Sequence, residues 1–159
     1  MTKARLLLAV LAVTVASAPS LIARGNAVTI RLDITGGRLT QPLAITERAL
    51  LDLSGVYQGT FLGDLEINGV DPNWSRYALT FVVAPQIPTA ACPADSRKAY
   101  VAYYVRNPAT DEGFVYLPGR GEDGYRTNIS MMIRDGDDGR WHRAHPDWAA
   151  LLNSYLPRD

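Results

Sequence analysis

Residues 113–148 read GFVYLPGRGEDGYRTNISMMIRDGDDGRWHRAHPDW, and this stretch decides the fold of the second half of the chain. Two apolar, β-prone runs at 114–117 and 125–133 predict strands joined by the glycine-rich loop between them. An acidic turn at 135–139 leads to a brief strand at 140–143. Short connections of this kind predict consecutive antiparallel hairpins.

A helix over 146–155 is predicted to end the fold. Pro146 suits the first helical position, and Asp147 favours the positive N-terminal end, so His145 is the residue that enters the helix. Apolar side chains recur at intervals of three and four residues, which gives one packing face: Trp148, Leu151, Leu152 and Tyr155.

Two strong strands precede this stretch. Residues 99–105 read AYVAYYV, a β-prone run. Alternation places Tyr100 and Tyr104 on one face of that strand and Tyr103 on the other. Residues 76–84, RYALTFVVA, are apolar on both faces, which is typical of a central or covered strand.

The N-terminal part of the fold is predicted to be a hairpin and a short helix. Residues 27–35 alternate, with one face expected to be buried: Val28, Ile30, Leu32 and Ile34. A second, edge strand is expected at 39–45, and Thr46 is expected to cap a helix near 46–54. Short strands and turns are expected in 56–70.

These elements predict a β-rich α+β fold. Six to seven short strands form an antiparallel sheet or a partly open barrel, packed against one short helix near 46–54 and a C-terminal helix near 146–155. The chain has 159 residues, enough for one domain, which is expected over 24–159.

The first 23 residues are typical of a secretory signal peptide. Lys3 and Arg5 precede a ten-residue apolar run, and small residues follow, so cleavage is expected between 17 and 27. The apolar run is shorter than the roughly 20 residues of a membrane span. We expect an exported protein, periplasmic, envelope-bound or secreted, with no transmembrane span once processed.

Charge and cysteine content narrow the function. Lys plus Arg and Asp plus Glu both number 16, so the balanced charge argues against nucleic acid as a partner. Cys92 is the only cysteine, so no internal disulfide can form, and its role stays open between a reactive and a packed thiol. No cofactor or metal site is expected, because the two histidines lack ligands at zinc spacing.

The loop at 118–124, PGRGEDG, has two interpretations. Its glycines and Arg120 suit an anion cradle, although Glu122 would repel the anion. Glycines with positive φ in a hairpin connection explain the loop without a ligand, and this interpretation is favoured. The candidate ligand-binding residues here and in the following strands are Arg120, Glu122, Tyr125, Trp141 and His142.

A general base is the second chemical hypothesis. His142 or His145 would accept a proton, with Asp147 or Glu122 near it. Alternation in the strand at 140–143 places His142 opposite Trp141, however, and no nucleophile motif is present. Abundant tyrosines along the strands are typical of sheet packing, and an exposed row of them would bind a sugar, peptide or lipid.

The segments TGGRLTQPLAIT, FVYLPGRGEDGYRTN and GRWHRAHPDWAALL resemble small exported bacterial proteins without an assigned role. The resemblance implies export and a single domain, and nothing chemical. We therefore expect a non-catalytic module that binds a small ligand or an envelope protein. The alternatives are a small envelope hydrolase or transferase that uses the histidines, and an accessory subunit or inhibitor that acts through loop 118–124.

Overall fold

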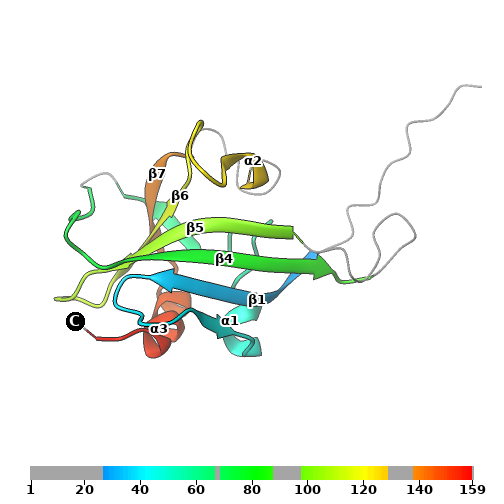
Figure 1. The fold of residues 1–159 in the computed structure, drawn as a ribbon, viewed down its shortest axis with the longest axis horizontal. Helices are drawn as coiled ribbons and strands as arrows, with labels where there is room; N and C mark the ends of the chain where they lie inside the picture. The colour runs from blue at the N-terminus through cyan, green and yellow to red at the C-terminus, as the bar shows by residue number, and fades with distance from the viewer. Residues whose placement is uncertain (1–26, 67–68, 88–97, 129–137, 159) are drawn as a thin grey trace, which may run out of the picture.

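The computed structural model describes residues 27–66, 69–87, 98–128 and 138–158 (Figure 1). The predicted signal peptide, Cys92 and most of the acidic turn at 135–139 lie outside these residues. No helix in the described ranges has both the length and the apolar character needed to cross a membrane.

Within the described residues, seven antiparallel strands form one open sheet, in the order β2-β1-β4-β5-β6-β7-β3. The strands are β1 (Ala27–Gly36), β2 (Leu43–Ile45), β3 (Leu62–Leu65), β4 (Arg76–Pro85), β5 (Lys98–Arg106), β6 (Gly113–Leu117) and β7 (Arg140–Ala144). The helices are α1 (Arg48–Asp52), α2 (Tyr125–Asn128) and α3 (Pro146–Tyr155). The predicted β-rich α+β fold is confirmed, as an open sheet and not a barrel.

Consecutive strands pair from β4 to β7, and the sequence predicted this for β4, β5 and β6. The early strands do not stay together. β1 and β2 extend the sheet beyond β4, whereas β3 lies at the opposite edge and pairs with β7. The hairpin from β1 to β2 turns at Gly36 and Gly37, whose φ angles of 82° and 56° favour glycine. The N-terminal third of the fold therefore borders both sides of the later strands.

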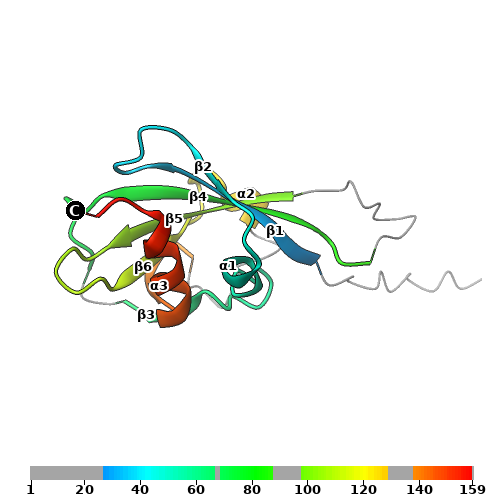
Figure 2. The ribbon, with the colours of Figure 1, turned by 90° about the horizontal axis from the view of Figure 1, so that it is seen from below.

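α1 and α3 lie on one side of the long strands, and α2 lies on the other (Figures 1 and 2). We call the side under α1 and α3 the covered face. Its strands contribute alternate residues to the core: Leu32, Ile34, Tyr77, Leu79, Phe81, Tyr100, Ala102, Tyr104 and Val115. α3 adds Trp148 and Leu152, as its predicted apolar face requires. The opposite side, which carries Ala78, Tyr103, Tyr116 and Trp141, is the open face.

A buried polar chain joins α1, α3 and β1. Trp148 Nε1 donates a hydrogen bond to Ser54 Oγ at 2.9 Å, and Ser54 Oγ donates to the Leu50 carbonyl at 2.8 Å. Thr29 Oγ1 donates to the Ser54 carbonyl. Since Ser54 and Trp148 have no exposed surface, each of these bonds satisfies a group that water cannot reach.

The predicted alternation of β1 is wrong at its N-terminal end. Thr29 pairs with Val83 and Arg31 pairs with Val82, so Ile30 is an extra residue and the strand contains a bulge. The bulge turns Thr29 into the core, whereas Val28 and Ile30 are only half-buried.

The predicted strand at 125–133 is wrong over its described part, because residues 125–128 form α2. The loop at 118–124 therefore does not lead directly into a paired strand; it begins the longer connection between β6 and β7, which pair antiparallel. Gly121 and Gly124 have the expected positive φ angles, 93° and 85°. Thr46 is also not the cap of α1: Glu47 occupies that position, and its side chain makes no capping hydrogen bond.

Candidate functional site

Three aromatic side chains are aligned across the open face. Tyr103 on β5 pairs with Tyr116 on β6, which pairs with Trp141 on β7. The ring centroids lie 6.3 Å apart for the two tyrosines and 5.2 Å apart for Tyr116 and Trp141. All three rings are half-buried, so each keeps accessible surface. Because neighbouring strands hold them, their positions are fixed by backbone pairing.

Arg76, at the start of β4, lies over these rings. Its guanidinium carbon is 4.4 Å from the centroid of Tyr103, and 5.4 Å from those of both Tyr116 and Trp141. These distances are within the range of cation–π attraction. Arg76 is exposed, and no ion pair joins it to a carboxylate of the described residues. We call Arg76, Tyr103, Tyr116 and Trp141 the aromatic–arginine cluster.

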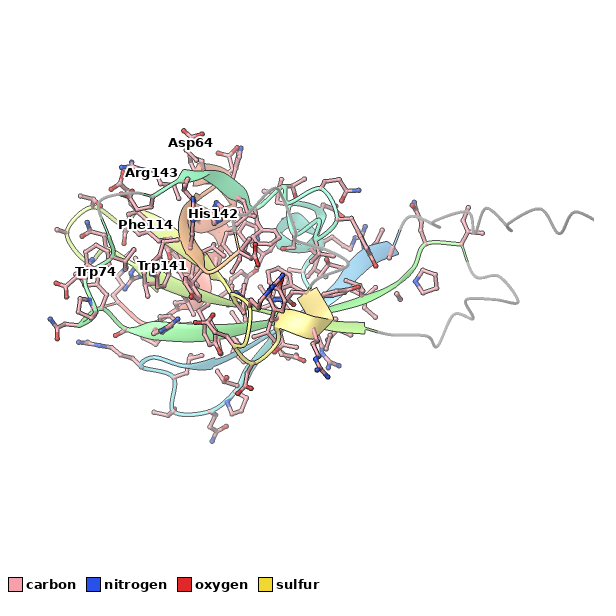
Figure 3. All side chains as sticks on the ribbon, turned by 90° about the horizontal axis from the view of Figure 1, so that it is seen from above. Asp64, Trp74, Phe114, Trp141, His142 and Arg143 are labelled. Atoms are coloured by element: carbon pink, nitrogen blue, oxygen red, sulfur yellow. The ribbon has the colours of Figure 1, made fainter. Side chains whose placement is uncertain are left out.

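A second aromatic pair lies beside the cluster on the same face. Trp74 stacks on Phe114 with a centroid distance of 5.8 Å and an interplanar angle of 27°. Figure 3 shows Trp74, Phe114 and Trp141 gathered over the same end of the sheet. Phe114 is buried, whereas Trp74 is half-buried, so Trp74 extends the accessible aromatic surface.

Glu122 closes one side of the cluster. Tyr116 donates its hydroxyl to Glu122 Oε1 at 2.9 Å, and the Gly119 N–H donates to Glu122 Oε2 at 2.7 Å. The loop at 118–124 thus holds a carboxylate of its own chain where the sequence suggested a bound anion. Burial, followed by the hydrogen bond to Glu122, raises the pKa of Tyr116 above its usual value.

The structure separates the predicted ligand-binding residues. Trp141 belongs to the cluster and Glu122 adjoins it. Arg120 is exposed in the loop, and Tyr125 is half-buried in α2. His142 is 4% exposed and lies on the covered face, opposite Trp141, as strand alternation requires.

The residues of the general-base hypothesis do not converge. His142 is buried on the covered face, whereas Glu122 binds Tyr116 on the open face. His145 enters α3, and its Nδ1 is buried without a hydrogen-bond partner among the described residues. Asp147 is exposed in the first turn of α3. His145 Nδ1 therefore makes no hydrogen bond to Asp147.

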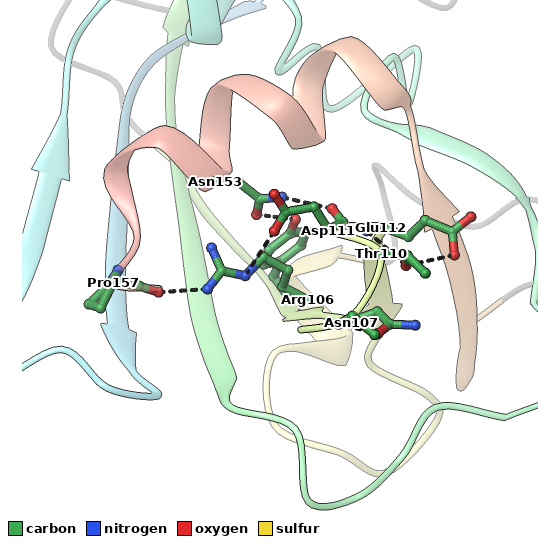
Figure 4. A network of polar contacts seen from close by, with 9 residues as sticks. Arg106, Asn107, Thr110, Asp111, Glu112, Asn153 and Pro157 are labelled. Carbon is green, nitrogen blue, oxygen red and sulfur yellow. Dashed lines mark hydrogen bonds and ion pairs between the residues drawn. The ribbon is translucent and has the colours of Figure 1, made fainter. Parts of the chain in front are cut away.

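A cleft of about 550 Å³ lies at the other side of the fold, between α3, the β5–β6 loop and the β3–β7 edge. Four of its charged side chains form two ion pairs. Arg106 Nε lies 3.6 Å from Asp111 Oδ1 (Figure 4), and Arg143 Nη1 lies 3.3 Å from Glu112 Oε1. Arg106 also donates to the Pro157 carbonyl at 2.8 Å. These contacts make Arg106 and Arg143 less available to an anionic ligand than Arg76.

Asn128 belongs to one of two glycosylation sequons, Asn128-Ile129-Ser130 and Asn73-Trp74-Ser75. Its side chain accepts a hydrogen bond from the Val101 N–H at 3.0 Å and donates to the Val101 carbonyl. Asn128 is 4% exposed, so its amide completes the edge of β5 and is not accessible for modification in this fold. Asn73 is exposed.

No group of three metal-ligating side chains occurs within the described ranges. Comparison of the chain with family models, with curated proteins and with solved structures finds no match.

The sequence identified the tyrosine-rich strands and Trp141, but it missed Arg76 and Trp74. One signal was available for Arg76: alternation places it on the face of Ala78, away from the buried Tyr77. Its contact with three rings from other strands depends on the register of β5, β6 and β7, which the sequence does not display.

Proposed function

We propose that this protein is an exported, non-catalytic binding module that holds its ligand against the aromatic–arginine cluster. The observation that carries the proposal is the position of Arg76 over three half-buried rings, each on a different strand. Tryptophan, tyrosine and arginine are the side chains that contribute most to binding at protein surfaces. Here they lie together on a face that α1 and α3 leave uncovered.

Pre-organisation supports binding at this position. Aromatic side chains have few rotatable bonds, and the pairing of β5, β6 and β7 already fixes their backbones. Little conformational entropy is then lost when a ligand binds, so more of the contact energy appears as affinity. The signal-like N-terminal segment supports export, and the separation of His142 from Glu122 supports a role without catalysis.

A thermal-shift screen of the purified protein tests the proposal. The panel contains cell-wall fragments, neutral and acidic sugars, fatty acids, phosphorylated compounds and divalent metals. A ligand at 100 times its dissociation constant stabilises a protein by about 2.7 kcal/mol, which raises the melting temperature by several degrees. We expect a hit whose shift is lost in Trp141→Ala and retained in Arg48→Gln, a control on α1 of the covered side.

A hit that shifts Trp141→Ala as much as the unchanged protein would place binding elsewhere and contradict the proposal. A double change of His142 and His145 to alanine tests catalysis in parallel. Loss of a measured enzymatic activity in a double variant that still melts cooperatively would favour the hydrolase or transferase alternative.

A further inference from the structure

We infer that the ligand of the aromatic–arginine cluster is an acidic saccharide, whose carboxylate binds Arg76 and whose ring lies against the aromatic side chains. This inference rests on the proposed function and deepens it by naming the ligand class. It depends on three features of the open face: an arginine without an ion-pair partner among the described residues, flat aromatic surfaces, and a backbone whose hydrogen bonds are already formed.

Arg76 supplies the site for the anion. A guanidinium that stacks on rings keeps N–H donors at its edge, and their fork geometry matches the two oxygens of a carboxylate. The nearby acid, Glu122, is already bonded to Gly119 and Tyr116. Since no carboxylate of the described chain neutralises Arg76, a ligand carboxylate meets a cation that is both oriented and available.

The rings supply a surface for the body of the ligand. Tyr103, Tyr116 and Trp141 are half-buried and keep accessible surface beside Arg76. Each combines an apolar ring with a polar tip, which suits a molecule with both C–H and hydroxyl groups. The pairs β5–β6 and β6–β7 already use the backbone groups between these strands. An extended peptide gains much of its affinity from such groups at a sheet edge, so this sheet face favours a saccharide.

The overall charge disfavours an anionic membrane as the partner. The whole chain has a formal net charge of zero, and removal of Lys3 and Arg5 with the predicted signal peptide makes it slightly acidic. Long-range attraction to a negative surface is therefore absent. Recognition of an anion must then come from local contacts such as those of Arg76.

Two matched probes and three variants test the inference. Isothermal titration compares oligogalacturonate with the same oligomer after methyl esterification, which removes the charge and keeps the sugar rings. Arg76→Gln removes the cation, Arg76→Lys keeps the charge without the fork, and Arg48→Gln removes one positive charge from the other side of the sheet. Melting of each variant confirms that it is folded.

We expect oligogalacturonate to bind the unchanged protein and Arg48→Gln with the same affinity. It should bind the unchanged protein at least about tenfold more tightly than the methyl ester does, since the ester cannot form the charge-assisted hydrogen bond to Arg76. Arg76→Gln should bind acid and ester equally weakly, with Arg76→Lys between. Equal affinity of the unchanged protein for both probes, or no effect of Arg76→Gln, would overturn the role of the carboxylate and leave the binding module standing. If oligogalacturonate does not bind, the inference of an acidic saccharide ligand is wrong. The thermal-shift screen with Trp141→Ala tests the proposed function independently.

Discussion

Trp148 and Trp141 are near neighbours in the sequence and lie on opposite faces of the sheet. Trp148 has no exposed surface, and its indole N–H donates a hydrogen bond to Ser54 Oγ. Its ring centroid lies 5.4 Å from that of Phe61 and 5.7 Å from that of Tyr104. Trp141 is half-buried and contacts Tyr116 and the Arg76 guanidinium. The fold buries the whole ring of Trp148, whereas part of the Trp141 ring stays accessible to solvent.

The two faces also differ in whether their polar groups have partners within the described part of the chain. On the covered face, Ser54 and Thr29 bond to groups of the same chain, as burial requires. On the open face, Arg76 keeps its charge without a neutralising acid among the described residues. We conclude that the covered face carries stability and that the open face carries the features of a binding site.

The largest expected effect separates the two tryptophans. Trp148→Ala removes a fully buried ring and should lower the free energy of unfolding by about 3–5 kcal/mol. Trp141→Ala removes partly exposed contacts and should cost at most about 1.5 kcal/mol. Urea denaturation of both variants measures the difference, and equal losses would remove the distinction between the faces.

A smaller effect is expected at Ser54. Ser54→Ala leaves the Trp148 indole N–H buried without its acceptor, so the free energy of unfolding should fall by about 1–3 kcal/mol. The matched control is Ser154→Ala on α3, where the hydroxyl bonds to the Leu151 carbonyl at an exposed position. That change should stay within about 0.5 kcal/mol, so a cost as large as that of Ser54→Ala would contradict the account.

Alkaline pH should weaken the covered face through Tyr104. Burial raises the pKa of this phenol well above its ordinary value of 10.0. The unfolded chain releases the proton near the ordinary value, whereas the folded protein retains it. Stability is therefore complete below about pH 10 and falls above it, by at most about 1.4 kcal/mol per pH unit.

Replacement of Tyr104 by phenylalanine tests whether this residue causes the loss of stability at alkaline pH. Denaturation at several alkaline pH values should show a shallower decline for Tyr104→Phe than for the unchanged protein. Tyr116 also has a raised pKa, but it is more accessible, so Tyr116→Phe should change the slope less. A larger change from Tyr116→Phe would reverse the comparison between the faces.

Among the changes at the cluster, Arg76→Gln should have only a small effect on stability. An exposed cation–π contact contributes about 0.5–1 kcal/mol, so the variant should melt close to the unchanged protein. Chemical denaturation measures this cost beside the affinity for the acidic probe. A loss of stability as large as that of Ser54→Ala would identify Arg76 as a structural clamp instead of a binding group.

Local patterns were sufficient to predict most elements of the fold. Alternation along β4 puts Tyr77, Leu79, Phe81 and Val83 on one face, and all four are at most 2% exposed. The i, i+3 and i+4 spacing predicted α3 with its ends correct. These patterns succeed because burial on one face imposes the period of the element on the sequence.

Tertiary contacts explain the errors. The β-prone residues after Gly124 form α2 because Asn128 bonds to the backbone of β5, which lies far away in the sequence. The bulge in β1 turns Thr29 inward, where its hydroxyl donates a hydrogen bond to the Ser54 carbonyl. The cluster itself requires the strand register that aligns Tyr103 with Tyr116 and Trp141, so the sequence predicted its members better than their arrangement.

The most direct test of the division of roles between the two faces is an NMR spectrum of the three tryptophan indole N–H groups. It is recorded with and without soluble cell-wall polysaccharide fragments. Single Trp→Phe variants assign the signals. We predict that the Trp141 signal moves as the fragments are added, and that the Trp148 signal, bonded to Ser54, stays in place. Movement of Trp148 with Trp141 unchanged would mean that the ligand acts on the covered face, and would contradict the division of roles between the two faces.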